Sequence, residues 1–135
     1  MMTIKQLYQD VFESVKGICD KTYLRSRPKS VEERIGSYIV VSLPYSIRNN
    51  EMNDSGAYND YSTTVQIEIY VRDKASASNP NGFNVNVMNE KVEKVRAVFP
   101  ISTENVLVIS PVITMQDDDG DGFGVTIIQA RLRTK

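Results

Sequence analysis

The sequence predicts one α+β domain over residues 1–135: an antiparallel four- or five-stranded sheet with two helices on one face. Three observations support this class. The chain has 135 residues, the usual size of a single domain. Val and Ile number 28, against 10 for Leu and Ala, and β-branched side chains favour strands. Apolar residues follow a helical spacing in two segments and alternate in the others, which gives the order α-β-β-α-β-β.

The first element is predicted to be an amphipathic helix from Ile4 to Ile18. Thr3 and Gln6 form a capping-box pattern at its start, in which each side chain bonds the other residue's backbone N–H. We interpret Cys19 as a small core residue, because free cysteine is among the most buried residue types. The apolar stripe consists of Ile4, Leu7, Tyr8, Val11, Phe12, Val15, Ile18 and Cys19.

Residues 20–34 are predicted to form a connector, since Pro28 excludes a helix through its middle. The segment carries five basic residues against three acidic ones. A solvated loop is one interpretation. The other is a contact surface for an acidic partner, such as a protein ring or a phosphate backbone. The basic residues are Lys21, Arg25, Arg27, Lys29 and Arg34, of which Arg25, Arg27 and Lys29 are the candidate contacts.

Two strands are predicted from alternating side chains, at Ile35 to Leu43 and at Ser62 to Arg72. Pro44 follows the first strand and either ends its regular pairing or marks an edge. The second strand alternates apolar and polar residues strictly, which indicates one buried and one solvated face. The polar residues 48–61 between the strands are predicted to form a long hairpin loop or arm.

A second polar loop, a second helix and two further strands complete the chain. Asn84 caps the predicted helix and Pro100 stops it. The strands run from Val106 to Gln116 and from Phe123 to Thr134. Pro111 predicts an edge or a bulge in the first of them. In the last strand the apolar residues change phase, which predicts either a bulge or burial on both faces.

The turn between these strands matches part of a calcium-binding loop. Asp117, Asp119, Asp121 and Gly122 stand at positions 1, 3, 5 and 6 of the loop pattern, and carboxylates on a sharply turned backbone suit Ca²⁺. Position 12, which needs a bidentate glutamate, is Ile128. We therefore favour a β-hairpin turn shaped by aspartate and glycine and predict no metal. Calcium at the three aspartates is the alternative.

Basic residues alternate along the end of the last strand. Arg131, Arg133 and Lys135 are two positions apart, so they share one face of a strand. One interpretation is an edge that charge protects from aggregation. The other is a positive rim for an acidic neighbour or for DNA.

Composition excludes most familiar catalytic chemistry. The chain has no His and one Cys, so it holds no Ser-His-Asp triad, no His-ligated metal and no internal disulfide. We predict no enzyme activity and no cofactor. A net charge of −1 argues against sequence-specific nucleic-acid binding. No apolar stretch approaches the roughly 20 residues that span a bilayer, and a cytoplasmic location is expected.

The order of elements resembles that of a family of bacteriophage proteins. An N-terminal amphipathic helix leads through a proline-containing connector to SYIVVSLP, a long polar loop, TTVQIEIYVRD, a second helix and a C-terminal hairpin. Over essentially its whole length, the chain is similar to the tail terminator, or tail completion, proteins of long-tailed phages and to related head–tail joining proteins.

This resemblance implies a structural protein without catalysis. Family members form rings, commonly hexamers, that cap the tail tube and join it to the head connector. The expected partners are therefore copies of the chain, tail-tube proteins and connector proteins, in the host cytoplasm during assembly and then in the virion. From charge alone, the connector and the basic last strand are expected to meet the acidic turn of a neighbour. The alternative function is a small-molecule- or calcium-binding α+β domain.

Overall fold

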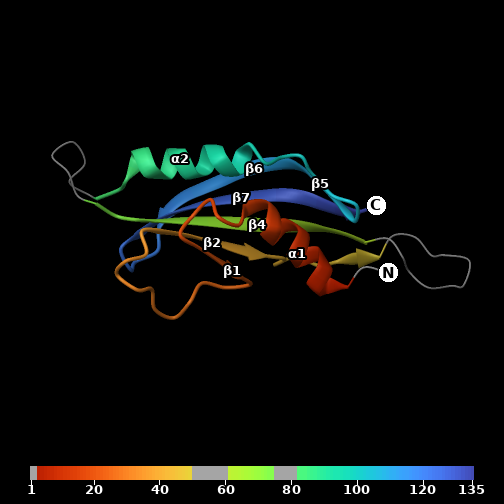
Figure 1. Cartoon of the computed structure of the whole chain (residues 1–135), viewed down its shortest axis with the longest axis horizontal. Coiled ribbons are helices and arrows are strands. Elements are labelled where there is room, and N and C mark those ends of the chain that lie inside the picture. Colours follow the sequence, from red (N-terminus) through yellow and green to blue (C-terminus); the bar gives the residue numbers. More distant parts are fainter. Residues whose placement is uncertain (1–2, 50–60, 75–81) are drawn as a thin grey trace, which may run out of the picture.

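The computed structural model describes residues 3–49, 61–74 and 82–135, without the side chains of residues 114–117. The described residues form two helices and seven strands of one long, twisted sheet (Figure 1). The strands lie in the order β1-β2-β4-β7-β6-β5, and β3 also pairs with β4. The elements are α1 (Ile4–Val15), β1 (Lys21–Leu24), β2 (Ser37–Ser42), β3 (Arg48–Asn49), β4 (Tyr61–Arg72), α2 (Val85–Arg96), β5 (Ile101–Ser102), β6 (Val106–Asp118) and β7 (Phe123–Thr134).

The predicted sheet of four or five antiparallel strands is wrong. The sheet has seven strands and is mixed, because β1 pairs with β2 in parallel while the other pairs are antiparallel. The predicted order α-β-β-α-β-β omits β1, β3 and β5. These strands are two to four residues long, too short for an alternating pattern to appear in the sequence.

The connector predicted at residues 20–34 is partly a strand and partly a crossover. Lys21–Leu24 forms β1, at one edge of the sheet. Parallel neighbours need a crossover of about a dozen residues, and residues 25–36 supply it. Val31 and Ile35 pack from this crossover onto the sheet. The connector is therefore not simply a solvated loop, because part of it covers the protein core.

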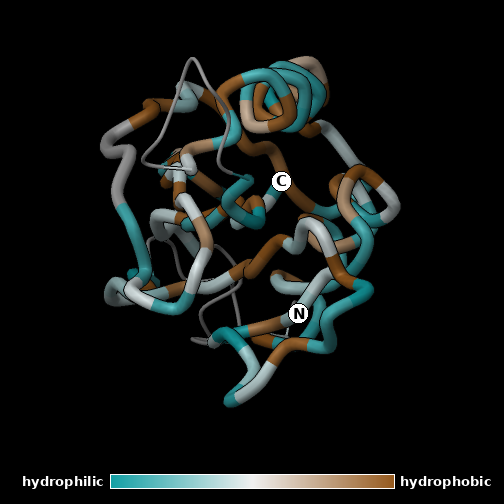
Figure 2. Tube along the Cα trace, turned by 90° about the vertical axis from the view of Figure 1, so that its left-hand side faces the viewer, coloured by the Kyte–Doolittle hydropathy of each residue, from teal (hydrophilic) through white to brown (hydrophobic). Residues whose placement is uncertain are grey.

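Both helices pack on the same face of the sheet. Leu7, Val11 and Val15 from α1 and Met88 and Val92 from α2 are buried against it. In Figure 2, where α2 is seen end-on at the top, hydrophobic and hydrophilic residues alternate around the helix. The sheet contributes the apolar side chains of one face to this core, among them Ile39, Val41, Val65, Ile67, Ile69, Ile128, Ala130 and Leu132.

The helix ends follow the local signals in the sequence. The capping box is present: the backbone N–H of Thr3 donates to Gln6 Oε1 at 2.7 Å, and that of Gln6 donates to Thr3 Oγ1 at 3.2 Å. The helix ends at Val15, three residues before the predicted end, and Gly17 takes a φ of 88°. Asn84 caps α2 as predicted. Cys19 is buried as predicted, with 5% of its surface exposed.

A second core lies on the sheet face without helices. Tyr38 stacks on Tyr70 with ring centroids 4.4 Å apart, and Phe123 meets Tyr38 edge-on at 5.2 Å. The crossover covers this cluster. Arg72 holds it there, because its guanidinium donates to the carbonyl of Ile35 at 2.9 Å and lies 4.6 Å from the centre of the Phe123 ring. The solvated face predicted for the strand at 62–72 is therefore wrong at this end, where Tyr70 is buried.

The hairpin β6–β7 has the predicted irregularities. Register shifts occur between Ile109 and Val112 and between Ile113 and Met115, which confirms a bulge at Pro111. By contrast, β4 pairs with β7 without interruption from Ser62 to Arg72. The phase change in β7 therefore reflects burial on both faces rather than a bulge.

We predict that the second core makes stability depend on alkaline pH. Tyr38 is 1% exposed, and burial raises the pKa of its hydroxyl from 10.0 to about 12. The folded state then holds this proton more tightly than the unfolded state, so the stabilisation is complete below pH 10 and is lost as the pH rises through 12. The contribution of Tyr38 to the free energy of unfolding should be about 1.4 kcal/mol lower at pH 11 than at pH 8.

Urea unfolding at both pH values measures this difference. Tyr38→Phe keeps the ring and removes the hydroxyl, so its alkaline loss of stability should be smaller. Tyr45→Phe is the control, because Tyr45 is 52% exposed, and it should behave as the wild type does. Equal alkaline losses in the wild type and in Tyr38→Phe would contradict the prediction.

Candidate interaction surfaces

The acidic turn, which we define as Asp118, Asp119 and Asp121, lies in a hairpin turn (residues 118–122) that is held by its own side chains. Asp118 Oδ1 accepts the backbone N–H of Gly120 at 2.7 Å. Asp119 Oδ1 accepts the N–H groups of Asp121 at 2.7 Å and of Phe123 at 3.1 Å. Gly120 and Gly122 have φ values of 80° and 89°, a backbone region that favours glycine. These aspartates and glycines supply turn geometry, as the hairpin interpretation expects.

Arg27 binds the acidic turn of its own chain. Its Nη1 lies 2.7 Å from Asp119 Oδ2, and its Nη2 donates to Asp121 Oδ2. The Asp119 side chain is 6% exposed and that of Asp121 is 63% exposed. The buried carboxylate of Asp119 therefore has the structural role. Its ion pair with Arg27 joins the crossover to the β6–β7 hairpin.

The other two candidate residues of the connector do not bind the acidic turn, and only Lys29 lies beside it. Arg25 has an exposed side chain, and its backbone N–H donates to the carbonyl of Val41 at 2.7 Å. Lys29 is exposed and lines a cavity of about 160 Å³ together with Arg27, Asp119 and Asp121. The structure thus places Arg27 and Lys29 beside the acidic turn of the same molecule, whereas Arg25 lies beside α1.

The calcium alternative gains no support from this geometry. Asp119 and Asp121 bind Arg27, and Asp119 also accepts two backbone N–H groups. The backbone of Asp117 is in β6, but its side chain lies outside what the structure describes. Among the described side chains, no group of three acidic or cysteine residues could hold a metal ion.

Carboxylates concentrate at this end of the sheet. Burial raises the pKa of Asp73 above its usual range, and the nearby Asp118 and Asp119 raise it further. Asp118 and Asp121 are exposed to solvent.

Three arginines gather at the opposite end of the sheet. Arg48, Arg131 and Arg133 are exposed and line a groove of about 450 Å³. The register places Arg48 and Arg133 on either side of Ser62, across three neighbouring strands, and pairs Arg131 with Thr64. The other described lining residues are uncharged: Tyr45, Ser46, Ser62, Thr63, Thr64, Ile109 and Leu132.

This arginine groove concentrates positive charge. Within residues 3–49, 61–74 and 82–135, none of the three arginines forms an ion pair. The predicted contact residues Arg131 and Arg133 thus lie in the same groove, as their spacing along the strand predicts. Arg48 joins them only through the pairing of β3 with β4. Sequence reasoning missed Arg48, because it falls within a segment that was predicted to be a loop.

An apolar surface follows the outer edge of β6. Strand β5 pairs with β6 only at Leu107 and Val108, and no other described strand pairs with that side of β6. Val112 is 56% exposed and Ile113 is 42% exposed. The sequence signalled this surface weakly, through the short apolar run around Pro111.

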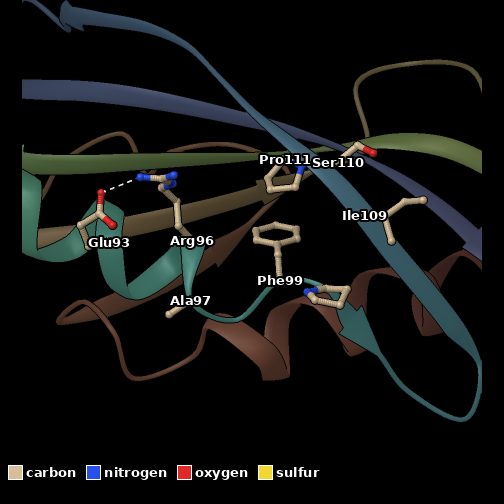
Figure 3. A pocket seen from close by; sticks show the side chains of 8 residues that line it. Glu93, Arg96, Ala97, Phe99, Ile109, Ser110 and Pro111 are labelled. Atoms are coloured by element: carbon tan, nitrogen blue, oxygen red, sulfur yellow. Dashed lines mark hydrogen bonds and ion pairs between the residues drawn. The ribbon is translucent and has the colours of Figure 1, made fainter.

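A groove of about 450 Å³ adjoins this edge (Figure 3). The ring of Phe99 points toward Pro111, and Ile109 lies farther along β6. At one end of the groove, Arg96 Nη1 bonds Glu93 Oε1 at 2.8 Å. Ile109 also lines the arginine groove. Both grooves therefore adjoin one strand edge that no described strand pairs with, which we call the β6 edge (Ile109–Ile113).

The only cysteine of the chain, Cys19, is buried, and burial raises the pKa of its thiol, which disfavours the reactive thiolate. No helix in the described ranges is long and apolar enough to cross a membrane.

Comparison with known proteins gives no assignment: no family model matches the chain, and no curated protein matches it. The resemblance to phage tail proteins therefore stays a prediction from element order.

We predict unequal roles for the two aspartates that Arg27 binds. Asp119→Ala removes the acceptor of two backbone N–H groups and of a guanidinium at a 6% exposed position, so it should lower the free energy of unfolding by about 1–3 kcal/mol. Asp121→Ala removes an ion pair at a 63% exposed position, and exposed pairs contribute about 0–1 kcal/mol. Urea titration at pH 7 measures both, and equal losses would contradict the assignment.

Proposed function

We propose that the protein is a non-catalytic structural subunit that assembles into a ring with copies of itself. The tail terminator and head–tail joining proteins of phages, which the chain resembles, work in this way. On this proposal the ring contacts tail-tube and connector proteins, is assembled in the host cytoplasm and then forms part of the virion.

The β6 edge is the observation that supports self-assembly. Natural proteins protect open strand edges with charge, short strands or bulges, because unpaired backbone groups and apolar side chains recruit another chain. The bulge and Pro111 limit direct strand pairing here. No charged residue lies between Ile109 and Ile113, and a valine and an isoleucine of this segment, Val112 and Ile113, are exposed.

A second copy of the chain is the occupant that fits this edge. Its surroundings resemble a protein interface, with an apolar centre and a charged rim. The centre consists of Phe99, Pro100, Ile109, Pro111, Val112 and Ile113, and the rim consists of Arg96, Arg131 and Arg133. Burying one valine side chain stabilises a complex by about 1.5–3 kcal/mol, so a few such contacts matter.

Val112→Asp should weaken self-association, because it places a carboxylate in the buried interface. We expect the dissociation constant from sedimentation velocity to rise at least tenfold and rings in negative-stain images to disappear. Stability should change little, since Val112 is 56% exposed in the single chain.

Val85→Asp is the matched control. Val85 is 54% exposed at the first residue of α2, away from the β6 edge, and an acidic residue there suits the helix N-terminus. This variant should assemble as the wild type does. A wild-type chain that stays monomeric at every concentration would overturn the proposed function, and equal effects of the two variants would overturn the role of the edge.

A further inference from the structure

We propose that the β6 edge of one copy packs against a groove between α1 and β1 of the next copy. The inference rests on the proposed function and deepens it, because it names the surface that receives the β6 edge. The contact is head-to-tail, so each copy offers one edge of its sheet to each of two neighbours.

One row of apolar side chains crosses the sheet from edge to edge. The register links five residues in succession through β1, β2, β4, β7 and β6, and register partners point to the same face of a sheet. Leu24 and Ile113 end the row and are 46% and 42% exposed, whereas the three residues between them are fully buried. In order, the row consists of Leu24, Val41, Ile67, Ile128 and Ile113.

The row ends at β1 in an apolar groove. This groove of about 410 Å³, which we call the β1 groove, has Tyr8, Phe12 and Leu24 among its lining residues. The hydroxyl of Tyr8 accepts the backbone N–H of Leu43 at 3.3 Å, which orients the ring between helix and sheet. Ile4 precedes Tyr8 by one helical turn and is 60% exposed, so it extends the apolar surface. No described strand pairs with the outer side of β1.

Exposed apolar side chains concentrate at these two edges. Of the six large hydrophobic residues that are exposed in the described ranges, Val112 and Ile113 lie on the β6 edge, and Ile4 and Leu24 lie at or beside the β1 groove. Clustered apolar side chains on a surface mark interaction sites. Each copy therefore carries, at opposite edges of its sheet, two apolar surfaces that can cover each other.

The two edges also have the same layered construction. Arg96 and Ala97 of α2 line the groove that adjoins the β6 edge, and α1 lines the β1 groove. Both helices pack on the same face of the sheet, so the two grooves lie on that face as well. Pro111 and the bulge limit strand pairing at β6, so the contact is made by side chains, with Ile113 of one copy against Leu24 of the next.

The geometry of the row favours a ring over a twofold dimer. Figure 1 shows β1 and β6 on opposite sides of β4 and β7. Four strand spacings of about 4.8 Å separate the ends of the row by roughly 19 Å, so one chain cannot close the contact on itself. Contact between two different surfaces is heterologous, and it closes into a ring or continues as a filament.

Leu24→Asp should weaken self-association, because it places a carboxylate at the end of the row inside the contact. We expect the dissociation constant from sedimentation velocity to rise at least tenfold. Val85→Asp introduces the same charge at a residue that is 54% exposed and lines neither groove, and it should assemble as the wild type does. Equal effects of the two variants would overturn the role of the β1 groove.

Cysteine crosslinking tests the contact without changing any charge or apolar side chain. Gln9 lines the β1 groove, and Ser110 lines the groove that adjoins the β6 edge. Both are exposed, and the native Cys19 is buried. The double variant Gln9→Cys/Ser110→Cys, treated with a short bismaleimide, should give a ladder of dimers, trimers and larger species on denaturing gels. A bridge within one chain runs as a monomer, so every step of the ladder reports a contact between copies.

Three controls complete the design. Each single cysteine variant should give no ladder. Gln9→Cys/Asn86→Cys should give none either, because its second cysteine replaces an exposed residue near the start of α2, away from the β6 edge. Adding Leu24→Asp to the double variant should lower the crosslinked yield at least tenfold.

The outcomes separate this inference from the proposed function. A ladder that depends on Leu24 supports the head-to-tail contact. A ladder that survives Leu24→Asp, or a crosslinked dimer of the single variant Ser110→Cys, overturns it. Assemblies seen by light scattering without any crosslink overturn the contact and leave the proposed ring intact. A chain that is monomeric by light scattering and gives no crosslink overturns both.

Discussion

Strands β4 and β7 form the centre of the sheet, and their apolar side chains on both faces have to be covered. The helices cover one face, where Ile67 and Ile128 lie side by side. On the other face, the crossover between β1 and β2 covers Tyr70 and Val125, which are also register partners. Because both described helices pack on one face of the seven-stranded sheet, another segment has to cover the apolar side chains of the second face.

The crossover is this covering segment, and two arginines hold it in place. Arg72 reaches from β4 to the carbonyl of Ile35, and Arg27 reaches from the crossover to Asp119. The acidic turn is therefore part of the second core as well as a surface. The crossover covers one end of this face, and Arg131 and Arg133 are exposed at the far end.

Charge segregation follows from the length of the β6–β7 hairpin. Among the described residues, carboxylates lie at the β6–β7 turn and three arginines lie at the far end of the sheet, although the net charge of the whole chain is only −1. Exposed ion pairs are weak one at a time, so such charges contribute little to an assembly unless apolar surface is buried beside them. The β6 edge, next to the arginine groove, adds the apolar area that charge alone does not supply.

Local signals in the sequence determined much of this structure. The capping box at Thr3, the cap at Asn84, the bulge at Pro111 and the long strand of β4 each depend on neighbouring residues, and each is predicted from them. The sharing of a face by Arg131 and Arg133 needs only the period of a strand.

Only the tertiary structure decided which strands and side chains are neighbours. Strand β1 exists because β2 presents an open edge to Lys21–Leu24, and such pairing over four residues leaves no pattern in the sequence. Arg27 meets Asp119 across 92 positions of the chain, and Arg48 joins Arg133 through Ser62 of β4. These contacts depend on which strands are neighbours, and strand order is set by burying both faces of the whole sheet rather than by any local run of residues.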